Sequence, residues 1–340
     1  MLNLLLTYDY ELFFNKSFAS EKDVLIDPAY EIAKGLSNEG VGATFFVDTP
    51  SVIAYKKIGL DEYPSMVKKQ VNYFLETNHD VQLHIHPIWY KSVYKDGEWE
   101  FNNDYYALKA FSNVEEIIKE SKACLDELVE GNSRYLCCAF RAGGFCYNPE
   151  KEITETLLKL GIKIDSTVCK GLMKDTLAQE FDFKKAPAED NWFFGPNGIL
   201  TKTTEKVGLF EIPIGTYKYV PHKWVLTHCM PKLPLPPRKG LSTPVTRSRE
   251  MTMLDRISLS INTPVLFTCD SLHAKALLAI VKHYERRAVD KDIYISIIAH
   301  PKISSDVCVE NTVSFVQMVK NSCHNTRFVT MKDVVNIENL

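Results

Sequence analysis

The sequence predicts an α/β protein built on a parallel β-sheet. Short runs of apolar and β-branched residues alternate with longer segments in which apolar residues recur every three or four positions. Two of the longer segments begin with Asp or Asn followed by proline and stop at glycine, which are start and stop signals of helices. Because strands and helices alternate strictly, we expect parallel strands joined by right-handed helical crossovers.

The first part of the chain carries this pattern most regularly. A buried strand is expected over 4–8, and the helix that follows begins at Asp27, has Pro28 in its first turn and ends at Gly40. A strand at "ATFFV", a helix over about 63–77 and a strand at "VQLHIH" come next.

The same pattern continues toward the middle of the chain. Asn113 and Glu116 stand in capping-box relation at the start of a helix that stops at Gly131, before the strand "YLCCAF". The helix "NPEKEITETLLKLG" then leads into the strand "IKIDS". Residues from about 170 to 250 are rich in Pro, Gly and Lys, and we expect an irregular excursion there with a strand at "LFEIPIG".

The α/β alternation returns in the last part of the chain. Its expected elements are "PVLFTCDS", the helix "HAKALLAIVKHYERRA", the strand "IYISIIAHP", a helix over about 306–321 and "TRFVTM". The sequence shows no internal repeat and no low-complexity tail. Residues 1–340 are therefore expected to form a single domain.

The composition argues against some partners. At 340 residues and 45% hydrophobic content, the chain can bury a sizeable core. A formal net charge of −3 gives no electrostatic support for binding nucleic acid or an anionic membrane, so neither partner is expected. No apolar stretch approaches the ~20 residues that a membrane span needs.

The expected location is the cytoplasm. Nine cysteines are scattered without metal-type spacing, and reduced thiols are a simpler account of them than a disulfide framework. The N-terminus, "MLNLLLTYDYELF", has no basic region and indicates a first buried strand rather than a signal peptide. We therefore expect a soluble cytoplasmic protein, whose oligomeric state the sequence leaves open.

Polar residues gather where the predicted strands end. The carboxyl ends of parallel strands are where barrel and open-sheet enzymes place their sites. His84 and His86 are two positions apart on one strand, so their imidazoles face the same way and can converge on one metal ion. The residues at the ends of five predicted strands are Asp9, Glu11, His84, His86, Arg141, Asp165 and His300.

Each of these residues also has a purely structural interpretation. A His-x-His pair on a strand can be a hydrogen-bonded pair instead of a pair of ligands, and Asp9 and Glu11 could cap a loop. Arg141 could simply hold down a carboxylate, and His300, standing alone before a proline, would favour a structural role. The functional interpretation requires several of these residues to lie close together at the carboxyl ends of the strands.

The order of the motifs resembles the polysaccharide deacetylase family, metal-dependent enzymes that remove N-acetyl groups from glycans. The similar segments are "LTYDYE", "GVGATFFV", "HDVQLHIHP", "AFRAGGF", "GIKIDSTV", "ISIIAHPK" and "RFVTM". They extend from about residue 4 to 335, with 170 to 290 poorly covered. The resemblance implies a distorted (β/α) barrel of about seven strands, with a metal held by one aspartate and two histidines.

The resemblance also implies roles for single residues. Asp9 matches the aspartate that usually serves as general base, and Arg141 matches the arginine that orients it. His300 matches the general acid, and Asp165 matches the aspartate of the fourth motif, which could hold His300 or another supporting residue in register. His84 matches the first metal histidine.

Two positions depart from the family pattern. Tyr10 stands where the family has a second aspartate, and Ile88 stands where it has the second metal histidine. Glu11 and His86 are the available replacements, since each lies two residues from its partner on one strand face. We therefore expect a divalent ion at Glu11, His84 and His86, with Asp9 as the alternative carboxylate and zinc as the first choice because nitrogen ligands dominate.

The expected function is a metal-dependent hydrolase of a non-peptide C–N amide bond. It would remove an N-acetyl group from an intracellular amino sugar, a precursor of capsule or O-antigen, because no signal peptide is evident. One alternative is hydrolysis of another C–N bond, as in allantoinase-like members, some of which act without a metal. Another is a non-catalytic sugar-binding barrel that lost turnover through the changes at Tyr10 and Ile88.

Overall fold

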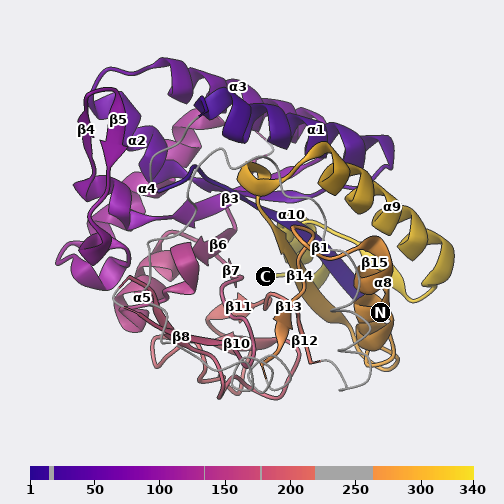
Figure 1. Cartoon of the computed structure of the whole chain (residues 1–340). Coiled ribbons are helices and arrows are strands. Elements are labelled where there is room, and N and C mark those ends of the chain that lie inside the picture. The colour runs from indigo at the N-terminus through magenta and orange to yellow at the C-terminus, as the bar shows by residue number, and fades with distance from the viewer. Residues whose placement is uncertain (15–18, 134, 177, 219–262) are drawn as a thin grey trace, which may run out of the picture.

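A curled, mostly parallel β-sheet lies at the centre of the protein, with helices along its outer face (Figure 1). The computed structural model describes residues 1–14, 19–133, 135–176, 178–218 and 263–340. The strand order is β10-β11-β7-β6-β3-β2-β1-β14, and β15 also pairs with β1. The strands are β1 (Leu2–Tyr10), β2 (Thr44–Asp48), β3 (Asp80–Ile85), β6 (Ala139–Ala142), β7 (Ile164–Asp165), β10 (Trp192–Phe194), β11 (Leu209–Glu211), β14 (Ile293–Ala299) and β15 (Thr326–Phe328).

The curled sheet closes on itself through the backbone that follows β11. The amide of Ile214 donates to the carbonyl oxygen of Val168 over 2.9 Å, on the β7 side. On the β14 side, the amide of Gly215 donates to the carbonyl oxygen of Ser296 over 2.9 Å, and the amide of Ser296 donates to Pro213 over 3.1 Å. Seven parallel strands, β1, β2, β3, β6, β7, β11 and β14, therefore form a distorted barrel, and the predicted fold class is confirmed.

Amphipathic helices cover the outside of this barrel. In α1, Ala29, Ile32, Ala33 and Leu36 are buried, as the apolar stripe in the sequence predicts. Figure 1 shows α1 and α3 along one side of the sheet, and α8 and α9 next to β14 and β15. The helices are α1 (Asp27–Asn38), α2 (Thr49–Lys57), α3 (Glu62–Glu76), α4 (Val114–Leu128), α5 (Glu150–Lys159), α8 (Ala274–Glu285), α9 (Asp306–Ser322) and α10 (Met331–Glu338).

The ends of the helices differ in detail from the prediction. The helices expected over 63–77 and 306–321 match α3 and α9 within a residue. Asn113 precedes α4 but makes no capping hydrogen bond, so the predicted capping box is wrong there. A capping box forms instead at the start of α10, between Thr330 and Asp333.

The irregular excursion is present as far as the structure describes it. Between β7 and β11 the chain forms the hairpin β8 (Met173–Asp175) and β9 (Glu180–Asp182), followed by β10, which runs antiparallel to β11. The strand predicted at "LFEIPIG" is β11. Residues 219–250 of the predicted excursion lie outside the described residues.

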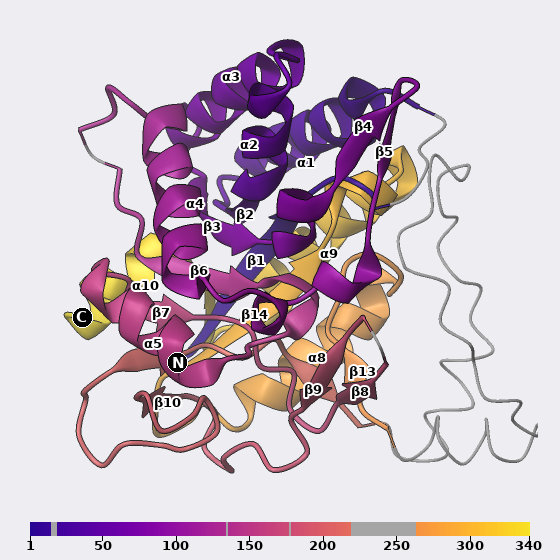
Figure 2. The same ribbon diagram turned by 90° about the vertical axis from the view of Figure 1, so that its left-hand side faces the viewer.

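Two further antiparallel strand pairs lie outside the main sheet. The first pairs β4 (Val93–Lys95) with β5 (Glu98–Glu100), and Figure 2 shows it extending beside the helical layer. The second pairs β12 (Thr216–Tyr217) with β13 (Val265–Leu266). Short 3-10 turns connect strand ends to the rest of the chain; three of them are η2 (Pro87–Lys91), η5 (Gly143–Phe145) and η6 (Pro301–Ile303).

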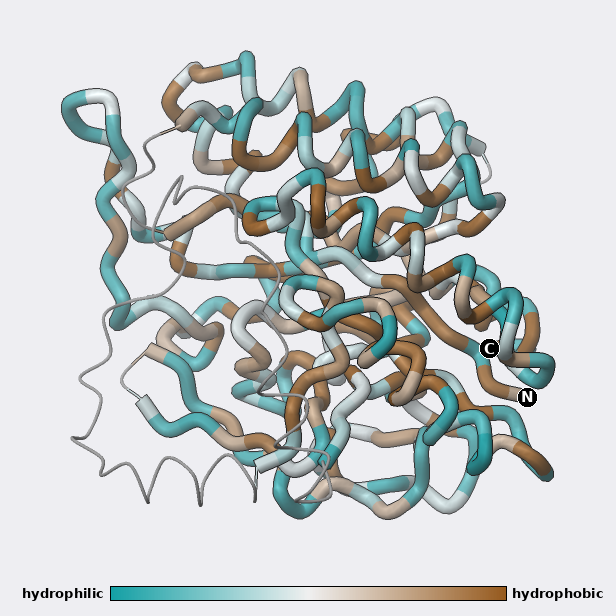
Figure 3. Tube along the Cα trace, turned by 45° about the vertical axis from the view of Figure 1, so that its right-hand side comes forward, coloured by the Kyte–Doolittle hydropathy of each residue, from teal (hydrophilic) through white to brown (hydrophobic). Residues whose placement is uncertain are grey.

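Hydrophobic residues concentrate in the central strands, whereas hydrophilic and hydrophobic residues alternate along the surrounding helices (Figure 3). Every residue of β1, β2, β3 and β14 is buried. Polar side chains inside these strands therefore need a partner or a function, because an unpaired buried polar group is costly. Within the described residues, no helix combines the length and the apolar character required to cross a membrane.

Candidate active site

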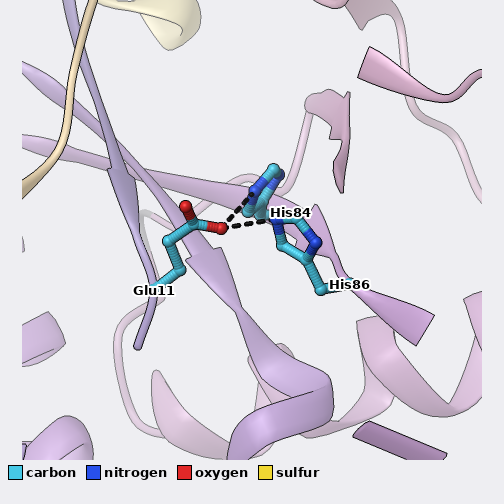
Figure 4. A group of neighbouring side chains, drawn as sticks. All are labelled: Glu11, His84 and His86. Carbon is cyan, nitrogen blue, oxygen red and sulfur yellow. Dashed lines mark ion pairs between the residues drawn. The ribbon is translucent and has the colours of Figure 1, made fainter. Parts of the chain in front are cut away.

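Three side chains from two strands converge at the carboxyl end of the barrel. Glu11 follows β1, His84 lies in β3, and His86 comes directly after β3. Oε2 of Glu11 is 3.3 Å from Nε2 of His84 and 2.5 Å from Nε2 of His86, and all three side chains are buried (Figure 4). The ligand atoms of the three residues lie within 4.8 Å of one another, so the cluster has the size of a metal site.

The hydrogen bonds of this cluster fit a cation between its members. Nδ1 of His84 donates to the carbonyl oxygen of Arg141 over 2.8 Å, so Nε2 of the neutral ring carries a lone pair. Nε2 of His84 and Oε2 of Glu11 are buried, and apart from the close contacts within the cluster itself neither has a hydrogen-bond partner among the described residues. Burial lowers the pKa of His84, but Asp9, Glu11 and Asp48 raise it above its ordinary value, so the space between Nε2 and Oε2 of Glu11, 3.3 Å apart, favours positive charge, either a proton or a metal ion. Two imidazoles and one carboxylate are a donor set that suits zinc and similar ions.

His86 is held in place by its neighbours. The carboxylate of Asp48, at the end of β2, accepts hydrogen bonds from the amide of His86 and from Nε1 of Trp89, each over 2.8 Å. A Cβ at Gly143 would lie 2.5 Å from the carbonyl oxygen of Ile85 and 2.6 Å from Nδ1 of His86, so glycine leaves the room that the ring needs. Burial lowers the pKa of His86 to about 4, which keeps the ring neutral and able to bind a metal.

Of the two candidate carboxylates, Glu11 lies closer to the imidazoles. Oδ2 of Asp9 is 4.0 Å from Nε2 of His84, compared with 3.3 Å for Oε2 of Glu11. Burial alone would raise the pKa of Glu11, but the ammonium group of Lys302 and the two imidazoles outweigh it and hold this pKa well below its usual value. Glu11 is therefore ionised and available as a ligand.

Asp9 is paired with a fully buried arginine. Nη1 of Arg141 donates to Oδ1 of Asp9 over 2.5 Å, and Nη2 donates to the hydroxyl groups of Thr7 and Ser166, each over 3.0 Å. The Arg141 guanidinium also lies 4.2 Å from the centre of the Phe46 ring. These contacts fix Asp9 by one oxygen and leave Oδ2 toward the imidazoles. Burial raises the pKa of Asp9, but Arg141 and the nearby imidazoles lower it below its ordinary value.

His300 forms a second charged pair at the same mouth. Its Nδ1 donates to Oδ2 of Asp270 over 2.8 Å, and its amide donates to Oδ1 of the same carboxylate over 2.8 Å. Nε2 points the other way, 3.7 Å from Oδ2 of Asp9 and 3.8 Å from Oε1 of Glu11. Burial lowers the pKa of His300, but Asp270, Asp9 and Glu11 together raise it to about 9. His300 thus carries a proton directed at the cluster.

Asp165 does not hold His300, which corrects the expectation that it could. Asp165 pairs in register with Phe140, whereas Arg141 pairs in register with His84. Since neighbouring strand residues alternate between faces, Asp165 faces away from the cluster. Its carboxylate accepts hydrogen bonds from the amide of Thr167 over 2.9 Å and from the Thr167 hydroxyl over 3.1 Å.

Glu211 is the second member of a buried carboxyl pair with Asp165. The two residues pair in register across β7 and β11, so their side chains share one face. Burial raises the pKa of Asp165 to about 6, and burial together with Asp165 raises the pKa of Glu211 well above its usual value. At neutral pH the pair retains a proton, because two adjacent buried carboxylates repel.

The two residues that depart from the family pattern belong to the core. Tyr10 turns toward the helices, where its hydroxyl donates to Oε1 of Gln70 over 2.6 Å. Ile88 is fully buried in η2. Neither residue lies among the candidate ligands, whose positions are filled by Glu11 and His86.

A cavity of about 360 Å³ opens over these groups. Sequence reasoning missed two of its charged residues, Asp270 and Lys302. Asp270 ends the predicted strand "PVLFTCD" and so carried the same signal as the other sites, and Lys302 follows His300 by two positions. The ionisable residues of the lining are Asp9, Glu11, His86, Tyr106, Asp270, His300 and Lys302; Gln179, Thr268 and Ser271 are also polar, and Phe14, Phe145, Leu266 and Ile303 are among the apolar ones.

Comparisons with known proteins give weak similarities to solved structures. No protein-family model matches this chain, and no curated protein sequence matches it. A probable polysaccharide deacetylase from Pseudomonas aeruginosa PAO1 shares 11% identity, with 98% of this chain and 89% of that chain covered and a TM-score of 0.49. PuuE allantoinase shares 10% identity, with 98% and 88% covered and a TM-score of 0.49.

A third similar structure belongs to a protein described as lacking activity. BA3943, a CE4 family pseudoenzyme from Bacillus anthracis, shares 9% identity, with 98% of this chain and 65% of that chain covered and a TM-score of 0.41. These similarities concern the fold alone, so the chemistry of this site follows from its own residues. At the mouth of the barrel these residues are the Glu11–His84–His86 cluster, the Asp9 carboxylate held by Arg141, and His300 held by the Asp270 carboxylate.

Proposed function

We propose that this protein is a metal-dependent hydrolase that removes an N-acetyl group from an amino sugar. One observation carries the proposal: the Glu11–His84–His86 cluster, the Asp9 carboxylate held by Arg141 and the Asp270–His300 pair all contribute residues to the wall of one cavity. Amide hydrolysis needs a group that activates water, a base that takes its proton and an acid that protonates the leaving amine. The sequence motifs that resemble those of polysaccharide deacetylases support the choice of an N-acetylated sugar.

Each set of residues has a separate task. Glu11, His84 and His86 would hold a divalent ion, for which zinc is our first choice; when bound, such an ion polarises a carbonyl group and acidifies water. Asp9 accepts a proton at Oδ2 while Arg141 keeps its other oxygen occupied. His300 gives its Nε2 proton to the departing amine, and Asp270 keeps the ring charged and oriented.

The substrate and the cellular location can be proposed more narrowly. We propose that the substrate is a sugar precursor of capsule or O-antigen in the cytoplasm. A free or nucleotide-linked N-acetylhexosamine then has to be a better substrate than a polymer of the same sugar. The enzyme is proposed to fold and act as a single domain over 1–340.

The test is release of acetate from purified protein. Free N-acetylglucosamine, its nucleoside diphosphate conjugate and chitin oligosaccharides are incubated with protein that has been stripped of metal and then reloaded with zinc, cobalt or nickel. We expect acetate from at least one sugar, only after reloading. Acetate from the stripped protein would contradict the metal dependence, and no acetate from any sugar under any loading would contradict the proposal.

A further inference from the structure

Lys302 is a buried cation in the wall of the candidate active site. It lies in η6, two residues after His300, and is only 5% exposed. Its Nζ donates to Oε1 of Glu11 over 2.8 Å and to the carbonyl oxygen of Leu12 over 3.1 Å. The ammonium group also lies 5.3 Å from the centre of the Phe13 ring and 5.0 Å from that of Phe14.

Burial of a lysine at this position costs free energy, which its contacts in the fold or the site have to offset. Burying an ammonium group removes its hydration, and a buried pair has to recover that loss through good geometry and further hydrogen bonds. Lys302 meets both conditions, since it has a carboxylate, a carbonyl oxygen and two aromatic faces around it. An apolar side chain of similar length would have filled the same space without this cost.

The two oxygens of Glu11 have different partners. Oε1 lies 2.8 Å from Nζ of Lys302 and 3.8 Å from Nε2 of His300. Oε2 lies toward the two imidazoles, 2.5 Å from His86 and 3.3 Å from His84. A carboxylate with one oxygen held in this way can offer only the other to an ion.

We propose that Lys302 is the positioning residue of the metal centre, holding Glu11 by Oε1 so that Oε2 alone is presented beside His84 and His86. The inference rests on the proposed function, because it concerns the same site. A metal site with two imidazole nitrogens and one carboxylate oxygen as ligands favours zinc, cobalt and nickel over calcium and magnesium, which prefer many oxygen ligands. Lys302 thus also sets which ions the centre prefers.

The experiment measures cobalt binding by the full-length protein in four forms: wild type, Lys302→Met, Lys302→Gln and Lys170→Met. Lys170 is the matched control, because its Nζ also donates to a carbonyl oxygen, that of Pro187 over 2.7 Å, and also lies over an aromatic ring, 5.0 Å from the centre of Trp192, but outside this site. Dissociation constants come from competition with a chromophoric chelator. The visible absorption of bound cobalt reports its coordination geometry, independently of any catalytic activity.

We expect Lys302→Met to weaken cobalt binding by about 10- to 100-fold and to change the cobalt spectrum, as loss of a hydrogen-bonding partner of a ligand does. Lys302→Gln keeps an N–H donor, one atom nearer the backbone, so it should bind at least about threefold more tightly than Lys302→Met, the worth of one hydrogen bond. Lys170→Met should bind as the wild type does.

Each other outcome has a definite meaning. Equal or tighter binding by Lys302→Met overturns the inference, because the ammonium group would then oppose the ion instead of presenting Glu11. If Lys302→Met does not fold, as judged by circular dichroism, the comparison of Lys302→Gln with wild type decides: an unchanged spectrum with an affinity loss below about tenfold supports the inference, and a loss equal to that of His84→Ala overturns it. If the wild type binds no cobalt, the proposed function fails, and the inference fails with it.

Discussion

Replacing Asp270 by asparagine should remove the charge that keeps His300 protonated. Asp270 accepts two hydrogen bonds from His300, one from Nδ1 and one from the amide, each over 2.8 Å. It is the strongest of the groups that raise the pKa of His300 to about 9, against the opposing effect of burial. Without this carboxylate, the pKa of His300 should return to about 6.5 or lower.

The size of the effect follows from the two pKa values. At pH 8 a group with a pKa of about 9 is about nine-tenths protonated, whereas one at or below about 6.5 is at most about 3% protonated. If His300 must be protonated to act as the acid, kcat of Asp270→Asn should fall by about 30-fold or more at pH 8. Because the raised pKa favours the charged form, the loss should shrink as the pH falls through about 6.

The assay is the pH profile of kcat for acetate release, together with the metal content of each protein. Asp190→Asn is the control, since Asp190 is also a buried carboxylate paired with cations, Arg287 and Lys291, but lies outside the cavity. Asp270→Asn should retain its metal and lose the alkaline part of the profile, while Asp190→Asn keeps both. An Asp270→Asn profile parallel to that of the wild type would refute the assignment of His300 as the acid.

Three further predictions follow from the same geometry. His300→Ala should lower kcat by roughly 10²- to 10⁴-fold while the metal stays bound, whereas His84→Ala should lose both; equal metal loss in the two variants would contradict this division of roles. Gly143→Ala should weaken metal binding, because its Cβ would lie 2.6 Å from Nδ1 of His86 and displace the ring, and an unchanged affinity for cobalt would count against it. The pKa of Glu211 is higher in the folded than in the unfolded protein, so the contribution of this group to stability is full at low pH and is lost as the pH rises. The free energy of unfolding of Glu211→Gln should therefore depend less on pH from about 5 upward than that of the wild type. Equal pH dependence of the two proteins in urea unfolding would contradict this.

Most of the site could be predicted because the barrel collects the carboxyl ends of its strands. The side chains of Asp9, His84 and Arg141 share the inner face through strand register, and Glu11 and His86 continue the same alternation beyond the strand ends. Alternation with a period of two is visible in the sequence, and it decides which face a residue occupies. The fold class could be predicted for a similar reason, since helix and strand patterns alternate along the chain.

The errors arose where this regular pattern stops. Asp165 comes at the end of a two-residue strand, and one step of alternation places it on the face away from His84, which the order of motifs does not show. Asp270 comes after β13, which is only two residues long, and the role of its carboxylate depends on its hydrogen bonds to His300, which no short sequence pattern shows. Lys302 lies in a 3-10 turn, where its contact with Glu11 depends on the pairing of β1 with β14, 290 residues apart. Pairing over such a distance is a property of the fold and not of any short motif.

Metal content is the most direct test of the central claim, that Glu11, His84 and His86 form a metal centre. Protein purified without chelator is analysed for its elements, alongside His84→Ala prepared in the same way. We predict close to one equivalent of a divalent ion, with zinc the first candidate, in the wild type and little in His84→Ala. Less than about 0.1 equivalent in the wild type, with no gain after addition of zinc, cobalt or nickel, would contradict the claim.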